Sequence, residues 1–195
     1  MDKLTLISGT LFISANIFAI LGLLLPDWIV TDTAGMNRFG LLSSCTTIYG
    51  REMSCFFPKL PMEWIITLFL IVSGILTISV TVILLVLSSL SPRNGRIINT
   101  ARWTGFTGMV LFCIAAIVFP MGFHEPTIGG ESYQLPSSYQ VGISYIFFVL
   151  SIWISVVSEL FAGKVCMPHF WFLSGSFSFF LVRFHSFRFV FWLHN

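Results

Sequence analysis

Charged residues are scarce in this chain of 195 residues. Asp, Glu, Lys and Arg together make up 9% of the sequence, against 56% hydrophobic residues and a mean hydropathy of +0.91. A soluble domain carries roughly 25% charged residues, which cover its water-facing surface. The shortage therefore argues against an ordinary soluble domain and predicts a single membrane domain, in which lipid takes the place of water as the solvent.

Sequence signatures of catalysis and of cofactor binding are also missing. The chain has no P-loop, no GxGxxG motif and no HExxH motif. Within the apolar body His124 has Glu125 beside it, but no serine or cysteine in the setting of a nucleophile. The net charge is only +2 and there is no long basic run. We therefore expect a non-enzymatic protein that binds no cofactor, metal or nucleic acid.

Four long apolar stretches are present instead, each sufficient to cross a bilayer. About 20 apolar residues span the hydrocarbon core at a rise of about 1.5 Å per residue. The spans are expected at about 4–25, 62–90, 101–123 and 139–163, with outer loops at 26–61 and 124–138. They predict an all-α membrane protein, a four-transmembrane-helix bundle within residues 1–168. In the third span, Gly105 and Gly108 would let a neighbouring helix approach closely.

The distribution of positive charge predicts how the bundle is oriented. Lys and Arg in short loops favour the cytosolic side, and the loop at 124–138 has neither. Arg38, Arg51 and Lys59 in the first loop oppose this orientation, but they are spread over a longer segment that also carries acidic residues. We therefore expect both termini in the cytosol. The positively charged positions that carry this assignment are Arg93, Arg96, Arg102 and Lys164.

Two cysteines, Cys45 and Cys55, fall in the first loop, on the side of the membrane where disulfides form and persist. A bridge between them would close a ring of about ten residues and contribute about 2.5–3 kcal/mol in the chain-entropy model. Two free thiols are the alternative. A zinc site is disfavoured because the loop has no histidine and the cysteines are not closely spaced. The sequence therefore predicts a disulfide.

The rest of the first loop has the composition of short β-strands. Residues 28–48 are rich in Ile, Val, Thr and Phe, which favours a small antiparallel sheet on the outer face. Trp28 stands at the end of the first span, where it either joins the aromatic belt at the lipid headgroups or packs under the loop. In the second case Tyr49, Phe56 and Phe57 are its expected partners.

Three features lie towards the end of the chain. Glu159 is an acidic residue inside the fourth span, where its carboxyl can reach the membrane interface, be protonated or face the bundle; intramembrane acids are functional candidates. Cys166 is a candidate for S-palmitoylation, with a free thiol as the alternative. Residues 169–195 form an aromatic tail, for which we expect either poor order or an interfacial position.

Several motifs together resemble a known family. Trp28, Gly40-Leu41-Leu42 and the two cysteines are similar to the W–GLW–C–C signature of the claudin-like four-transmembrane superfamily, although Leu42 replaces the second tryptophan. A more extensive resemblance, to the MOSMO (modulator of smoothened, attenuator of Hedgehog) family, covers about residues 1–168. It rests on Met1-Asp-Lys-Leu-Thr, Pro26-Asp-Trp-Ile, Cys45-x-Thr-Ile-x-Gly-Arg51, Ala101-Arg-Trp-x-x-Phe-Thr-Gly-Met109, Val149-Leu-Ser-Ile152 and Leu160-Phe-Ala-Gly-Lys-Val-Cys166, in one order.

This resemblance implies a claudin-like fold and a membrane adaptor that negatively regulates Hedgehog signalling by lowering Smoothened. It implies a multi-pass protein of the plasma membrane and the primary cilium membrane. The implied partners are a single-pass receptor-like protein with EGF-like repeats and a mahogunin-type RING ubiquitin ligase. The alternatives are a claudin-like junctional protein and a channel-associated subunit, whose polar path would include Asn16 and Glu159.

Overall fold

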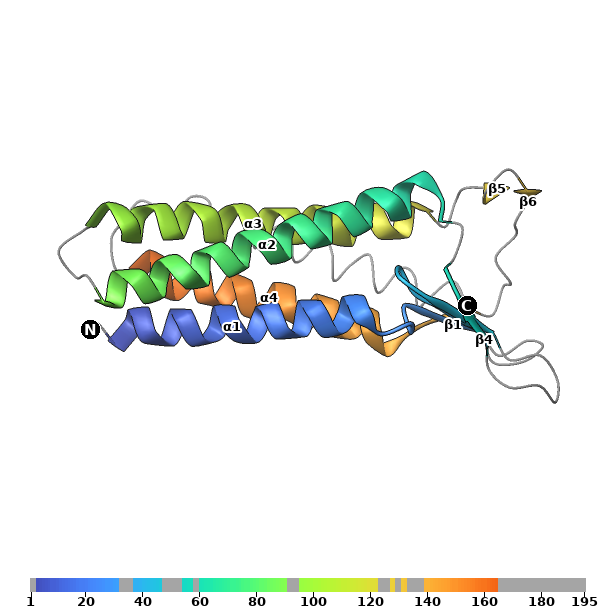
Figure 1. Ribbon diagram of the computed structural model, residues 1–195, viewed down its shortest axis with the longest axis horizontal. Helices are drawn as coiled ribbons and strands as arrows, with labels where there is room; N and C mark the ends of the chain where they lie inside the picture. The colour runs from blue at the N-terminus through green and yellow to red at the C-terminus, as the bar shows by residue number, and fades with distance from the viewer. Residues whose placement is uncertain are drawn as a thin grey trace.

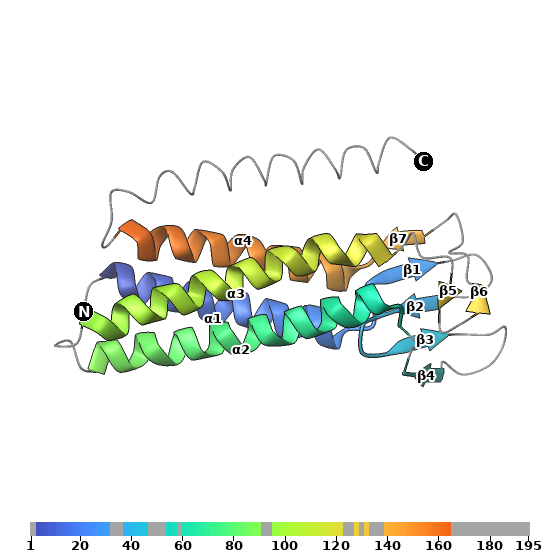
Figure 2. The same ribbon diagram turned by 90° about the horizontal axis from the view of Figure 1, so that it is seen from above.

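The computed structural model shows a bundle of four long helices with a small β-sheet at one end (Figures 1 and 2). It describes residues 3–31, 37–46, 54–57, 60–90, 95–122, 127–128, 131–132 and 139–164. The helices are α1 (Lys3–Leu24), α2 (Met62–Leu90), α3 (Gly95–Met121) and α4 (Ile143–Lys164). All four are long and apolar enough to cross a membrane. The predicted four-helix membrane bundle is therefore confirmed, and the chain is a multi-pass membrane protein.

The strands gather at one end of the bundle, which we call the sheet end. They are β1 (Ile29–Thr31), β2 (Asn37–Phe39), β3 (Ser44–Thr46), β4 (Ser54–Phe56) and β7 (Tyr139–Val141). These five form one antiparallel sheet in the order β4-β3-β2-β1-β7. A separate hairpin consists of β5 (Thr127–Ile128) and β6 (Glu131–Ser132). The antiparallel sheet predicted for the first loop is confirmed, while β7 is an addition from residues that the sequence predicts as the start of the fourth span.

Two helix starts differ from the sequence prediction. The sequence predicts a fourth span from residue 139, whereas residues 139–141 pair with β1 and the helix begins at Ile143. Between them, a Cβ added to Gly142 would overlap the carbonyl group of Asp27, so this position needs glycine. The sequence also predicts a third span from residue 101, whereas α3 already begins at Gly95. Hydropathy alone does not register the polar first turns of that helix.

Small residues let the helices approach one another. The main pairings are α1 with α4 and α2 with α3. A Cβ added to Gly22 would lie 2.9 Å from the carbonyl oxygen of Ser144, and one added to Gly108 would lie 2.7 Å from Cγ1 of Ile78. Gly105 and Gly108 therefore serve close packing within this chain. Close backbone approach at small residues is the usual way in which helices associate in lipid, where no hydrophobic force drives them together.

Large apolar side chains cover the outside of the bundle. Exposed examples are Phe69 and Leu76 of α2, Trp103 of α3 and Ile146 of α4. The side chains that are fully buried between the helices are mostly apolar too and include Phe12, Ile71, Ile78, Phe112 and Phe148. A helix that is apolar on all sides is expected only where its outer face meets lipid. The exposed apolar surface is therefore the lipid-facing surface of the molecule.

Replacing Gly22 by Ala should lower the stability of the bundle by about 1–3 kcal/mol, because the added methyl group would press on the backbone of α4. Gly9→Ala, on the same helix, is the matched control, since a Cβ added there meets nothing within 4 Å. Thermal unfolding of both variants in one detergent measures the difference. Equal melting temperatures for the two variants would contradict a close contact between α1 and α4.

Candidate functional site

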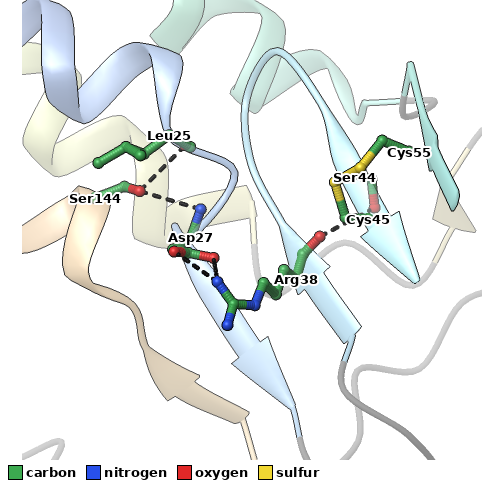
Figure 3. A network of polar contacts seen from close by, with 7 residues as sticks. All are labelled: Leu25, Asp27, Arg38, Ser44, Cys45, Cys55 and Ser144. Atoms are coloured by element: carbon green, nitrogen blue, oxygen red, sulfur yellow. Dashed lines mark hydrogen bonds and ion pairs between the residues drawn. A yellow bond between two sulfur atoms is a disulfide. The ribbon is translucent and has the colours of Figure 1, made fainter. Parts of the chain in front are cut away.

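The sheet is joined to the bundle where the chain leaves α1 and where it enters α4 (Figure 3). The Ser144 hydroxyl donates to the carbonyl oxygen of Leu25 and accepts from the backbone N–H of Asp27, both at 3.1 Å. The backbone N–H of Ser144 in turn donates to the Asp27 carbonyl oxygen at 3.0 Å. N–H groups in the first turn of a helix have no partner within the helix, so this bond satisfies one of them. A single buried serine thus fixes the end of α1 to the start of α4.

Trp28 is the residue on which the sheet rests. Its side chain is 1% exposed, and its indole N–H donates to the carbonyl oxygen of Gly22 at 2.7 Å. This carbonyl belongs to the last turn of α1, where the backbone oxygens lack partners within the helix. The Trp28 ring lies against Phe119 of α3 and Phe148 of α4, with centroid distances of 4.7 and 5.5 Å. The tryptophan therefore packs under the sheet and holds β1 against three helices.

Two of the three aromatic residues expected beside Trp28 lie elsewhere. Phe56 and Phe57 are 52% and 89% exposed and point away from the core. Tyr49 lies outside the described residues. The actual partners are Phe119 of α3 and Tyr145 and Phe148 of α4. They come from segments about 90 to 120 residues later in the chain, and local sequence pattern does not indicate which distant helices meet Trp28.

Trp64 repeats the arrangement on the other helix pair. It lies near the start of α2, and its indole N–H donates to the carbonyl oxygen of Phe119 at 3.2 Å, in the last turn of α3. Its ring stacks on the Phe119 ring at 5.6 Å, so Phe119 lies between the two tryptophans. A Cβ added to Gly122 would overlap the Trp64 indole. Sequence analysis missed Trp64, although a tryptophan just inside an apolar span next to an outer loop was an available signal.

The Gly40-Leu41-Leu42 motif forms the turn between β2 and β3. The Gly40 N–H donates to the Ser43 carbonyl oxygen at 3.0 Å. A Cβ added to Gly40 would lie 2.7 Å from the Cα of Pro26. The turn can therefore pack against the backbone at Pro26 only because position 40 is glycine. Leu41 is 2% exposed, and Leu42 packs against the same buried cluster from its edge. The motif thus seats the hairpin on the end of the bundle.

An ion pair and a disulfide complete the sheet (Figure 3). Nη1 of Arg38 on β2 donates to both carboxylate oxygens of Asp27, each at 3.1 Å. Bonds between charged partners are stronger than neutral ones, and Asp27 is only 14% exposed. The predicted disulfide is present: Cys45 and Cys55 face each other on β3 and β4, with their Cα atoms 4.1 Å apart. It attaches the outermost strand β4 to the strands that rest on the helices.

The positively charged positions lie at the opposite end of the bundle. Arg96 is exposed at the start of α3, Arg102 lies partly buried on the same helix, and Lys164 is the last residue of α4. The N-terminal end of α1 lies at this end as well (Figure 1). Arg93, Cys166 and the tail at 169–195 fall outside the described residues. The disulfide and the described cations of α3 and α4 therefore lie towards opposite ends of the bundle, whereas Arg38 lies at the sheet end, where it pairs with Asp27.

Glu159 faces the interior of the bundle rather than the membrane interface. It is 5% exposed, and its Oε1 lies against Gly105 of α3. A Cβ added to Gly105 would overlap this oxygen, so the close contact needs glycine at position 105. Phe12 and Thr81 approach the same point from α1 and α2. Oε1 has no hydrogen-bond partner among the described residues. Asn16, the other polar candidate of the spans, donates from its amide to Ser79 on α2 at 2.9 Å, so it joins two helices.

The arrangement as a whole presents a small rigid sheet at one end of a membrane bundle. Within the described residues no group of three or more His, Cys, Asp or Glu side chains could hold a metal ion. The buried residues at the sheet end include aromatic and aliphatic side chains, two serines and glycines, which position the backbone.

Replacing Trp28 or Trp64 by Phe should destabilise the protein by about 1–3 kcal/mol, because a buried helix-end carbonyl would lose its donor while most ring contacts remain. Trp103→Phe is the matched control, since this tryptophan is 66% exposed on the lipid-facing surface. Melting temperatures in detergent compare the three variants. A Trp28→Phe variant as stable as the control would refute the proposed role of the indole N–H.

A sequence model of the family described as Attenuator of Hedgehog matches residues 25–168. The match begins where the chain leaves α1 and extends just beyond α4. It therefore includes all five strands of the sheet, the disulfide, both buried tryptophans and the helices α2, α3 and α4.

Proposed function

Because the chain belongs to the Attenuator of Hedgehog family, we propose that it attenuates Hedgehog signalling by lowering the amount of Smoothened at the cell surface and in the primary cilium. The match over residues 25–168 is the observation that carries this proposal, and it confirms the family resemblance read from the motifs. The family is one of signalling regulators rather than a known enzyme family, so the proposal assigns no catalytic step to the chain. The protein acts as a membrane adaptor.

The proposal places the protein in the plasma membrane and the ciliary membrane, with the sheet end outside the cell. Two features support this orientation. Arg96, Arg102 and Lys164 lie at the end opposite the sheet, and positive charge favours the cytosolic side. The Cys45–Cys55 disulfide lies at the sheet end, and disulfides persist in the oxidising environment outside the cell. Both termini of the bundle are then cytosolic.

The proposed partners fit the two ends of the bundle. A receptor-like protein with EGF-like repeats would contact the sheet end, and a mahogunin-type RING ubiquitin ligase would act at the cytosolic end on Smoothened. Trp28 and Ser144 connect the sheet to α1 and α4, so the surface proposed for the receptor-like protein is held on the bundle. A surface held in this way pays little ordering entropy when a partner binds.

Cells that lack this protein should carry more Smoothened at their surface and should respond to less Hedgehog ligand. Surface labelling of Smoothened and a Hedgehog transcriptional reporter measure both effects. Re-expression of the wild-type chain should reverse them, as should Cys113→Ala, which alters a buried cysteine of α3 that forms no disulfide. The double variant Cys45→Ser and Cys55→Ser should reverse them less, since β4 would lose its covalent link. Unchanged Smoothened levels in null cells would reject the proposal.

Affinity purification of the full chain from membranes should recover an EGF-repeat receptor-like protein and a RING ubiquitin ligase, identified by mass spectrometry. The double variant Cys45→Ser and Cys55→Ser should lose the receptor-like protein, because its sheet is no longer stapled. It should keep the ligase, which the proposal places at the opposite end. Loss of the ligase alone would contradict the assignment of the two partners to the two ends.

A further inference from the structure

Two phenylalanines stand exposed at the free edge of the sheet. Phe56 closes β4 and is 52% exposed, and Phe57 follows it at 89%. Phe57 has the highest exposure among the large hydrophobic side chains that the structure describes. We call the segment Ser54–Phe57 the β4 edge, because within the described residues β4 pairs only with β3. An aromatic side chain buries roughly 150–250 Å² when it is packed, and this apolar surface stays in contact with the solvent when the side chain is exposed.

The β4 edge is followed in the chain by the lipid-facing surface of α2. The helix begins only five residues after Phe57, and its first exposed side chains are Met62, Ile65, Ile66 and Phe69. Positions spaced by three and four residues form one stripe along a helix. This exposed stripe extends to the start of α2, which lies at the sheet end of the bundle. Phe57 precedes that start by five residues in the chain. The exposed positions described in the first two turns of α2 are all apolar.

The length of α2 brings its start to the level of the lipid headgroups. Its 29 residues correspond to about 43 Å at a rise of about 1.5 Å per residue. The hydrocarbon core measures about 30 Å, and the bilayer with its headgroups about 40–45 Å. Five extended residues reach at most about 17 Å, so the β4 edge cannot lie far from the headgroups. In Figure 2 the sheet projects sideways past the sheet end of α2, with β4 at its outer edge.

We propose that Phe56 and Phe57 insert into the headgroup region of the leaflet on the sheet side and anchor the β4 edge on phospholipid. This region suits both parts of the edge. Its apolar depth accepts phenylalanine side chains, as it does for interfacial helices. Its water and polar headgroups can satisfy the backbone groups on the open side of β4, which the hydrocarbon core could not.

Lipid contact gives the sheet a second attachment. On one side, β1 and β7 are fixed to the helices through Trp28 and Ser144. On the other side, the disulfide carries β4 out past the helix ends, where lipid supports it. The inclination of the sheet to the membrane then depends on both attachments.

Photo-crosslinking from position 57 tests the proposal. The full chain carries p-benzoylphenylalanine in place of Phe57 and is irradiated in cell membranes before purification and mass spectrometry. We expect adducts with the mass of one phospholipid. The same substitution at Phe69, in the middle of the exposed stripe, shows that lipid adducts can be detected. A mobility shift on reduction verifies the Cys45–Cys55 bond, and with it the folded sheet, in each variant.

The other outcomes would overturn the proposal. An adduct to a second copy or to another protein would identify the β4 edge as a protein interface. No adduct from position 57, with lipid adducts from position 69, would place Phe57 in water. As a second measurement, Phe57→Trp in nanodiscs of brominated phospholipid should add emission that the bromine quenches, relative to the wild-type chain. Added emission without quenching would also overturn it.

Discussion

The backbone carbonyls at the sheet-end termini of α1 and α3 are the constraint on which this architecture depends. A helix leaves its last four carbonyl oxygens without partners, and close to a membrane each unsatisfied group is costly. The protein satisfies one on each helix with a tryptophan: Trp28 donates to Gly22, and Trp64 donates to Phe119. Both rings then contact Phe119, so the hydrogen bonds also build the aromatic layer under the sheet. The same two bonds thus finish the bundle and support the surface above it.

The sheet is consequently attached to the helices of the bundle by direct hydrogen bonds and an ion pair. Ser144 bonds to the segment that leaves α1, and Asp27 in that segment pairs with Arg38 on β2. Glycines at positions 40 and 142 remove the side chains that would separate these backbones. A partner bound at the sheet would therefore act on α1 and α4 directly, without a flexible linker between them. This coupling suits a regulator whose partners are expected on both sides of a membrane.

The sequence was sufficient for features that rest on composition and short-range pattern. The four spans follow from hydropathy, and the disulfide follows from two cysteines in one outer loop. It was insufficient where distant segments meet. The strand β7 was read as part of a helix because it precedes an apolar run directly, and its pairing with β1 depends on the whole bundle. The inward position of Glu159 depends equally on Gly105 in another helix.

The pairing of the first helix with the last one imposes an order on biosynthesis. Ile29 on β1 pairs with Val141 on β7, more than a hundred residues later in the chain. The chain must therefore be synthesised as far as β7, at the start of α4, before β1 gains its second neighbour in the sheet. Until then, Trp28 lacks the rings of α4, and the growing chain exposes one open edge of β1 to chaperones. Any truncation before α4 would leave this protein permanently in that unfinished state, visible to cellular quality control.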